Sequence, residues 1–119
     1  MSFRQGDVFW VDLGVPLGSE PGFSRPHVIV QNDVFNQSRI KTLVVCLLTS
    51  NLCRANDVGN VLLAPGEGGL PEQSVVNVSQ LSTVDKRELR EYVGTLSPEC
   101  VREALRGINL VLEPRDIPS

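Results

Sequence analysis

The sequence predicts a small, mainly β protein with helices, in which five or six short strands form a barrel-like sheet and an amphipathic helix follows. Three observations predict this fold. Short apolar runs alternate with turns rich in glycine, proline and serine up to Leu96; apolar residues then recur at helical spacing; and no repeat or linker interrupts the chain. At 119 residues the chain has the length of one domain, so we expect 1–119 to fold as a single unit.

The N-terminal half predicts three strands. Residues 8–11 form the first, and a loop rich in glycine, proline and serine follows over 13–25. Residues 27–30 and 42–49 are continuous apolar runs, which predicts strands buried on both faces or nearly so. The polar stretch 33–40 between them predicts a turn with a short helix.

The C-terminal half predicts further strands and the final helix. Residues 61–63 and 74–79 read as strands around a glycine-rich turn, and 92–96 as the last strand. Asp85 to Glu88 has capping-box spacing and predicts a short helical turn. Ser97 followed by Pro98 predicts a helix start, a core-facing stripe follows at Val101, Leu105, Ile108 and Leu112, and Pro114 ends the helix.

Composition and charge limit the classes of function that the protein can have. The net charge of −3 argues against a protein that coats nucleic acid, and the acidic excess belongs to residues 61–119. Nine of the eleven basic residues are arginine, whose planar fork suits phosphate or carboxylate, so a local cationic groove remains open. We find no signal-peptide core or membrane span and expect a cytoplasmic protein.

Several common chemistries are disfavoured. The single histidine, His27, excludes a two-histidine acid–base pair, and we interpret it as a partly buried residue satisfied by a neighbour. Three cysteines without C-x-x-C spacing indicate neither a disulfide framework nor zinc. The acids are scattered, so we expect no metal and no cofactor.

Polar residues at the ends of apolar strands form the candidate site. Arg25 precedes Pro26, which holds it in extended conformation at a strand entrance, and Thr49 and Ser50 stand where another strand ends. Such donors suit a phosphate group. Taken alone, an arginine at a strand start is more often a surface ion-pair partner than part of a site. The set also includes Glu20, Asn32, Asn51 and Gln80.

A family resemblance joins these observations. Its motifs, in chain order, are G-D-V-F-W-V-D-L, G-S-E-P-G-x-x-R-P-x-V-I-V-Q-N-D, L-T-S-N, G-N-V-L-L, S-V-V-N-V-S-Q and V-G-T-L-S. With them the sequence resembles the MazF/PemK family of toxins from type II toxin–antitoxin systems. The resemblance runs from about Arg4 to Leu112 and is most specific over residues 18–33.

The resemblance implies an SH3-like barrel with appended helices, a homodimer, and a metal-independent endoribonuclease that cuts single-stranded RNA at short sequences. It implies a cognate acidic antitoxin that blocks the same groove. Arg25 and Thr49 match the family's catalytic residues. His27 departs from the small apolar residue expected at its position, which puts the local pKa in doubt. The RNA-binding residues we expect are Ser19, Glu20, Asn32, Ser50, Asn51 and Gln80.

This chemistry needs few protein groups. RNA carries its own nucleophile, the 2′-hydroxyl, so the protein must align it with the phosphorus and neutralise the growing charge. The expected products are a 2′,3′-cyclic phosphate and a 5′-hydroxyl. Two alternatives remain: a CcdB-like toxin that binds DNA gyrase without cutting RNA, and an SH3-like peptide-binding module. The second requires an exposed aromatic groove, and aromatic residues make up only 5% of the chain.

Overall fold

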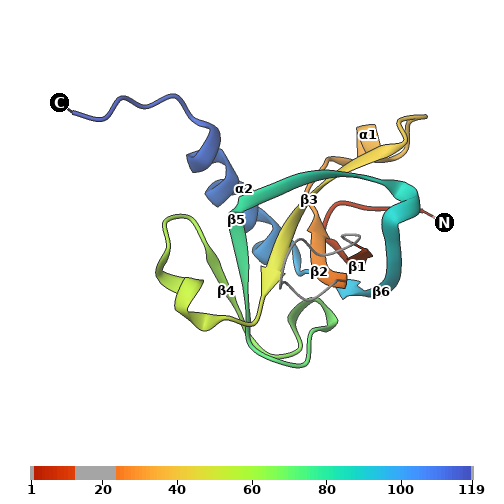
Figure 1. Cartoon of the computed structure of the whole chain (residues 1–119), viewed down its shortest axis with the longest axis horizontal. Coiled ribbons are helices and arrows are strands. Elements are labelled where there is room, and N and C mark those ends of the chain that lie inside the picture. The colour runs from red at the N-terminus through yellow and green to blue at the C-terminus, as the bar shows by residue number, and fades with distance from the viewer. Residues whose placement is uncertain (1, 13–23, 119) are drawn as a thin grey trace, which may run out of the picture.

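The computed structural model describes residues 2–12 and 24–118, and in them the chain forms one curled antiparallel sheet, a half-barrel, with a helix against it (Figure 1). The six strands lie in the order β4-β5-β3-β2-β1-β6. Their bounds are β1 Asp7–Asp12, β2 Ser24–Ile29, β3 Thr42–Thr49, β4 Val61–Leu63, β5 Ser74–Asp85 and β6 Leu89–Thr95. The α-helices are α1 Asp33–Asn36 and α2 Pro98–Leu112, and short 3₁₀ turns are η1 Leu52–Asn56, η2 Glu67–Gly69 and η3 Lys86–Glu88.

The sheet buries both of its faces, because side chains alternate along each strand. One cluster contains Val8, Val28 and Cys46 from the central strands, and it packs against Ala104 and Ile108 of α2. The other cluster lies on the opposite face, inside the curl of the sheet, and its members are Phe9, Val11, Ile29, Leu43, Val45 and Val84. Burial on both faces explains why β2 and β3 are such continuous apolar runs.

Glycines allow the turn η2 to pack directly on β6. A Cβ at Gly94 would lie 2.6 Å from the carbonyl oxygen of Gly68, so the two backbones meet with no room for a side chain. Gly69 approaches Val93 of β6 equally closely, at a positive φ of 79° that favours glycine. The glycine-rich turn predicted from sequence is therefore a packing element of the fold.

Most predicted elements are confirmed. The strand 42–49 has the predicted bounds, the capping box at Asp85 is present, and the side chain of Ser97 accepts from the backbone N–H of Cys100 as the N-cap of α2. The fold is mainly β with a C-terminal helix, as predicted.

The predictions were wrong for the starts of β2 and β6, for the end of β5 and for one residue of the helical stripe; β6 begins at Leu89 rather than at residue 92. Strand β2 begins at Ser24, so Arg25 belongs to the sheet rather than to the preceding loop. Strand β5 continues to Asp85, beyond the predicted end at residue 79. Leu112 is 67% exposed, because the contact of α2 with the sheet ends before its last turn, and Ala104 belongs to the buried face in addition to the predicted Ile108.

Candidate functional site

The site is an opening between β2 and β3 that Pro26 creates. Val30 donates its backbone N–H to Val44 of β3, and Ile29 directs its carbonyl oxygen away from β3 to Gly6, so even-numbered residues of β2 face β3. Pro26 is the even-numbered residue at the entrance of β2 and has no N–H to donate. The ladder between the strands accordingly begins only at His27 opposite Leu47.

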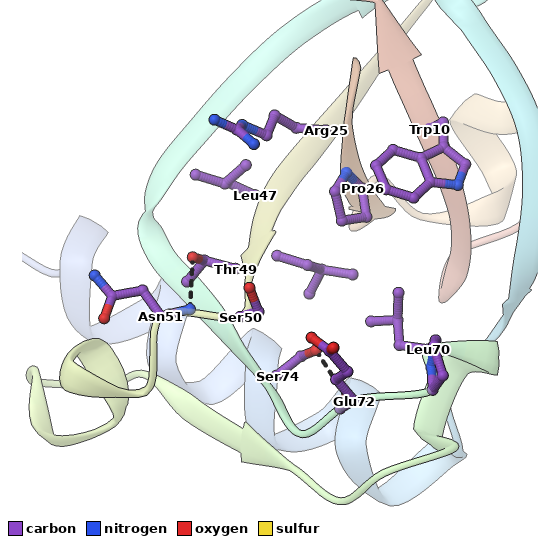
Figure 2. A pocket seen from close by; sticks show the side chains of 12 residues that line it. Trp10, Arg25, Pro26, Leu47, Thr49, Ser50, Asn51, Leu70, Glu72 and Ser74 are labelled. Carbon is purple, nitrogen blue, oxygen red and sulfur yellow. Dashed lines mark hydrogen bonds between the residues drawn. The ribbon is translucent and has the colours of Figure 1, made fainter. Parts of the chain in front are cut away.

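On either side of this opening, β2 stays paired with β1, and β3 stays paired with β5. Arg25 is paired with Val11 of β1, and Thr49 is paired with Val75 of β5. If the β2–β3 register continued past His27 and Leu47, Arg25 would stand directly opposite Thr49. The two predicted catalytic residues therefore line one pocket from its two sides, as Figure 2 shows.

The pocket has a volume of about 580 Å³. Figure 2 shows Arg25 and Leu47 at one end, Thr49, Ser50 and Asn51 along the side, and Glu72 and Ser74 at the far end. The remaining lining residues are Trp10, Pro26, Leu48, Leu70 and Pro71. One cation in a mostly apolar wall is the composition of a site in which a few polar groups orient a ligand.

The turn after β3 directs the hydroxyl of Thr49. The backbone N–H of Asn51 donates to Thr49 Oγ1 at 3.1 Å, and because the oxygen accepts there, the hydroxyl proton stays available to donate to a ligand. The side chain of Asn51 in turn caps η1 by accepting from the N–H of Cys53 at 3.1 Å. Ser50 is exposed between them.

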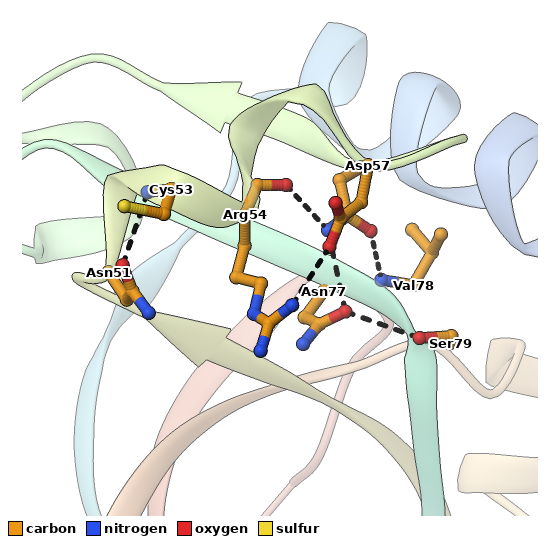
Figure 3. A network of polar contacts seen from close by, with 8 residues as sticks. Asn51, Cys53, Arg54, Asp57, Asn77, Val78 and Ser79 are labelled. Carbon is orange, nitrogen blue, oxygen red and sulfur yellow. Dashed lines mark hydrogen bonds and ion pairs between the residues drawn. The ribbon is translucent and has the colours of Figure 1, made fainter.

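A polar network fixes the loop after η1 to strand β5 (Figure 3). Asn60 donates to the carbonyl oxygen of Arg54 at 2.9 Å and accepts from the N–H of Val78 at 2.9 Å. Arg54 forms an ion pair with Asp57 at 3.5 Å. The network holds Arg54, an exposed cation, beside the strand that carries Gln80.

Gln80 lies next to the pocket rather than in its lining. It is exposed in a bulge of β5 where the register shifts between Cys46 and Leu47, so that Cys46 pairs with Leu81 and Leu47 with Asn77. Leu47 belongs to the pocket wall, which places Gln80 one strand away from it. Its predicted role as an RNA contact stays a prediction.

The structure does not bring Asn32 to this pocket. Asn32 follows the other end of β2 and caps α1, where its Oδ1 accepts from the N–H of Phe35 at 3.2 Å. Arg25 stands at the start of the same strand, seven positions earlier, which is roughly 23 Å away along an extended chain. Ser19 and Glu20, also predicted as RNA contacts, lie outside the described residues.

Sequence reasoning missed Trp10 and Glu72. Trp10 is 36% exposed, and it stands opposite Pro26 on the strand where its neighbour Phe9 is buried. Both aromatic residues lie in β1, and strand alternation was the signal that they point to opposite faces of the sheet. Glu72 contributes a carboxylate to the pocket, and no sequence signal indicated it.

His27 is buried directly behind Arg25, as the interpretation of a satisfied histidine predicted. Its side chain is 4% exposed, and its Nδ1 lies 3.0 Å from the carbonyl oxygen of Arg25. Burial lowers the pKa of His27 and outweighs the hydrogen bond to Arg25, which raises the pKa. The ring is therefore neutral at pH 7 and is not a ready proton donor.

Two of the three cysteines, Cys46 and Cys100, have raised pKa values. Burial raises the pKa of Cys46 to about 12, and its Sγ donates to the carbonyl oxygen of Asn77. The pKa of Cys100 is also raised, first by burial and then by its hydrogen bond to Glu67. Over residues 2–12 and 24–118, no three His, Cys, Asp or Glu side chains gather as a metal site requires.

A second depression, far along β3 from the pocket, is the more basic one. It has a volume of about 420 Å³ and lies beside the start of β3 and the end of β5. Arg39, Lys41, Lys86 and Arg87 line it around a single acid, Asp85, with which Arg87 pairs at 3.0 Å. Sequence reasoning expected the cationic groove around Arg25, whereas the largest group of cations lies here.

Fold and pocket together define the class: a small curled-sheet protein with a pocket that offers an arginine and hydroxyl donors to an anion between two strand ends. Comparisons with known proteins identify the family. Residues 4–112 match the family described as the PemK-like, MazF-like toxin of type II toxin–antitoxin systems, and the chain belongs to this family.

Curated relatives agree over nearly the whole chain. Endoribonuclease MazF6 of Mycobacterium tuberculosis is 37% identical over 113 residues, which is 95% of this chain and 99% of that protein. Endoribonuclease MazF of Staphylococcus saprophyticus is 34% identical over 109 residues, 92% of this chain and 90% of that protein.

A solved mycobacterial endoribonuclease in complex with its cognate antitoxin has the same fold, with a TM-score of 0.74, 24% identity, and coverage of 94% of this chain and 98% of that one. MazF from Deinococcus radiodurans has a TM-score of 0.73 at 19% identity, with coverage of 94% and 97%.

Proposed function

We propose that this protein is the toxin of a type II toxin–antitoxin system and acts as an endoribonuclease on single-stranded RNA. The observation that carries the proposal is the pocket between β2 and β3, which Arg25 and Thr49 line from two different strands. Family membership and the curated endoribonuclease relatives support it. RNA in the cytoplasm is the corresponding substrate, and no helix in residues 2–12 and 24–118 is long and apolar enough to cross a membrane.

The geometry supports cleavage by the RNA's own 2′-hydroxyl. Arg25 neutralises charge that builds on the phosphate oxygens, and the Thr49 proton, left available by the Asn51 contact, holds a non-bridging oxygen. The 2′-hydroxyl gives its proton to water as its oxygen bonds to the phosphorus. The bond from phosphorus to the 5′-oxygen breaks and this oxygen takes a proton from water, which gives a 2′,3′-cyclic phosphate and a 5′-hydroxyl. Each well-placed donor of this kind accounts for about 3–4 kcal/mol, or a hundredfold to a thousandfold in rate.

Replacing either donor tests the assignment. We expect R25A and T49V each to lower the cleavage rate by about a hundredfold or more, while T49S, which keeps the hydroxyl, retains most of the activity. R102A, at an exposed position on α2, is the matched control. Rates on a defined RNA and the melting temperature of each variant are the measurements. Full activity of R25A with an intact fold contradicts the site.

A substrate with a 2′-deoxy sugar before the cut separates this mechanism from any other nuclease chemistry. We expect it to remain uncut, because the attacking oxygen is missing. Normal cutting contradicts attack by the 2′-hydroxyl. Binding to DNA gyrase without RNA cleavage would indicate the CcdB-like alternative.

The partners follow from the family. We propose a homodimer and a cognate acidic antitoxin segment that occupies the pocket and competes with RNA for Arg25. The last turn of α2 supports the dimer, because Leu110, Val111 and Leu112 are each more than 40% exposed there. The solved complex of a family member with its cognate antitoxin supports the second partner.

A further inference from the structure

The entrance of β2 is held on one side only. Its carbonyl and N–H groups at odd-numbered positions face β1, where Val11 pairs with Arg25. Toward β3 the first possible bond is missing because Pro26 has no N–H, and the ladder begins at His27. Among the described strands, Arg25 is therefore paired with β1, and the β2–β3 ladder begins two residues after it.

His27 adds a side-chain hydrogen bond to the peptide that precedes Pro26. Its Nδ1 lies 3.0 Å from the carbonyl oxygen of Arg25, the oxygen of the peptide that joins Arg25 to Pro26. A carbonyl oxygen only accepts, so Nδ1 carries the hydrogen, and this contact fixes one tautomer of the ring. Phe9 of β1 and Leu47 of β3 stand opposite His27 on either side, so the ring is packed in place.

We propose that His27 is a positioning residue for Arg25, holding the Arg25–Pro26 peptide so that the guanidinium enters the pocket from a fixed direction. The proposal rests on the proposed function and names a residue that does not itself touch the RNA. Its physical basis is preorganisation: a donor aimed before the reaction contributes to the rate, whereas one that must be ordered during the reaction loses part of its effect.

The chain has one histidine and therefore one imidazole spin system, which makes the contact measurable without assignment. Nitrogen-15 NMR of the ring at pH 7.5 should show the hydrogen on Nδ1. A ring protonated only on Nε2 overturns the proposal. This measurement does not depend on cleavage, so it separates failure of this proposal from failure of the proposed function.

Two variants test the consequence for catalysis. H27F keeps a ring but loses the donor, and we expect kcat to fall about fivefold to tenfold with KM nearly unchanged, because the loss of one hydrogen bond misplaces a group that acts in the transition state. H27N places an amide donor near the position of Nδ1 and should restore most of kcat.

The control variant must disturb the packing around His27 and leave its hydrogen bond to Arg25 intact. F9L changes the buried neighbour opposite His27 and should lower the melting temperature while leaving kcat close to that of the wild type. If H27F keeps the wild-type kcat, or if F9L lowers kcat as much as H27F does, His27 acts only as part of the core. If the wild-type protein cuts no RNA, the proposed function fails. The NMR measurement of the ring tautomer then still tests whether His27 donates to the carbonyl oxygen of Arg25.

Discussion

Trp10 shows how one residue of β1 joins the site without any motif to mark it. Its partner across the strands is Pro26, and both line the pocket that contains Arg25. An indole face beside a cation is a stacking surface for an unpaired base. We infer that Trp10 contributes to RNA binding and Arg25 to the reaction itself.

Exchange of Trp10 should therefore affect binding more than catalysis. We expect W10A to raise KM about tenfold with little change in kcat, because stacking contributes about 1–3 kcal/mol per base, and W10F to fall between W10A and the wild type. Trp10 is the only tryptophan in the chain, so quenching of its fluorescence by an uncut 2′-deoxy oligonucleotide measures the contact directly. A wild-type KM for W10A would exclude stacking.

At the scale of elements, the strands with unbroken apolar runs were predictable and the polar ones were not. Every residue of strand β3 is buried or half-buried, and its nearly continuous apolar sequence favours a strand over a loop. The second half of β5 carries Ser79, Gln80, Ser82 and Thr83, which suggest a loop, yet pairing with β3 keeps this segment in the sheet. Tertiary pairing overrode local propensity there.

The contact of α2 with the loop before β4 depends on a glycine pair. A Cβ at Gly107 would collide with the carbonyl oxygen of Gly59, and Gly59 itself has a φ of 80°. We expect G107A to lower the free energy of unfolding by about 2 kcal/mol or more, since the helix must shift away from the sheet. N109A, at an exposed position on the same helix, is the control and should have little effect. Denaturant unfolding measures both, and equal stability of the two variants contradicts the packing argument.

At the scale of the whole molecule, charge is distributed unevenly on an acidic protein. The net charge is −3, the pocket contains one cation and one acid, and four basic residues gather in the separate depression at the other end of β3. Binding at the pocket alone therefore involves few phosphates, and the affinity for RNA should depend only weakly on salt.

The salt dependence distinguishes the two basic regions. For single strands the logarithm of the affinity falls by about 0.7 per phosphate for each tenfold rise in salt, so contacts from Arg25 and Arg54 alone should give a slope of about −1.4. The measurement is RNA affinity between low and moderate salt, with an oligonucleotide that cannot be cut. A slope steeper than about −3 would show that the RNA also reaches the depression lined by Arg39 and Lys41.

The sequence by itself determined most of the strands, the capped helix and the family, because apolar periodicity, capping residues and family motifs can be read along the chain. The roles of Arg25 and Thr49 come from the family resemblance and stay predictions. Only the tertiary structure decided what surrounds them. It placed Trp10 and Glu72 in the pocket and Asn32 at the far end of β2, because strand register and the curl of the sheet set which side chains meet. It also placed Pro26 where the β2–β3 ladder begins, next to the pocket that Arg25 and Thr49 line, and the missing N–H matters only because β3 lies beside it.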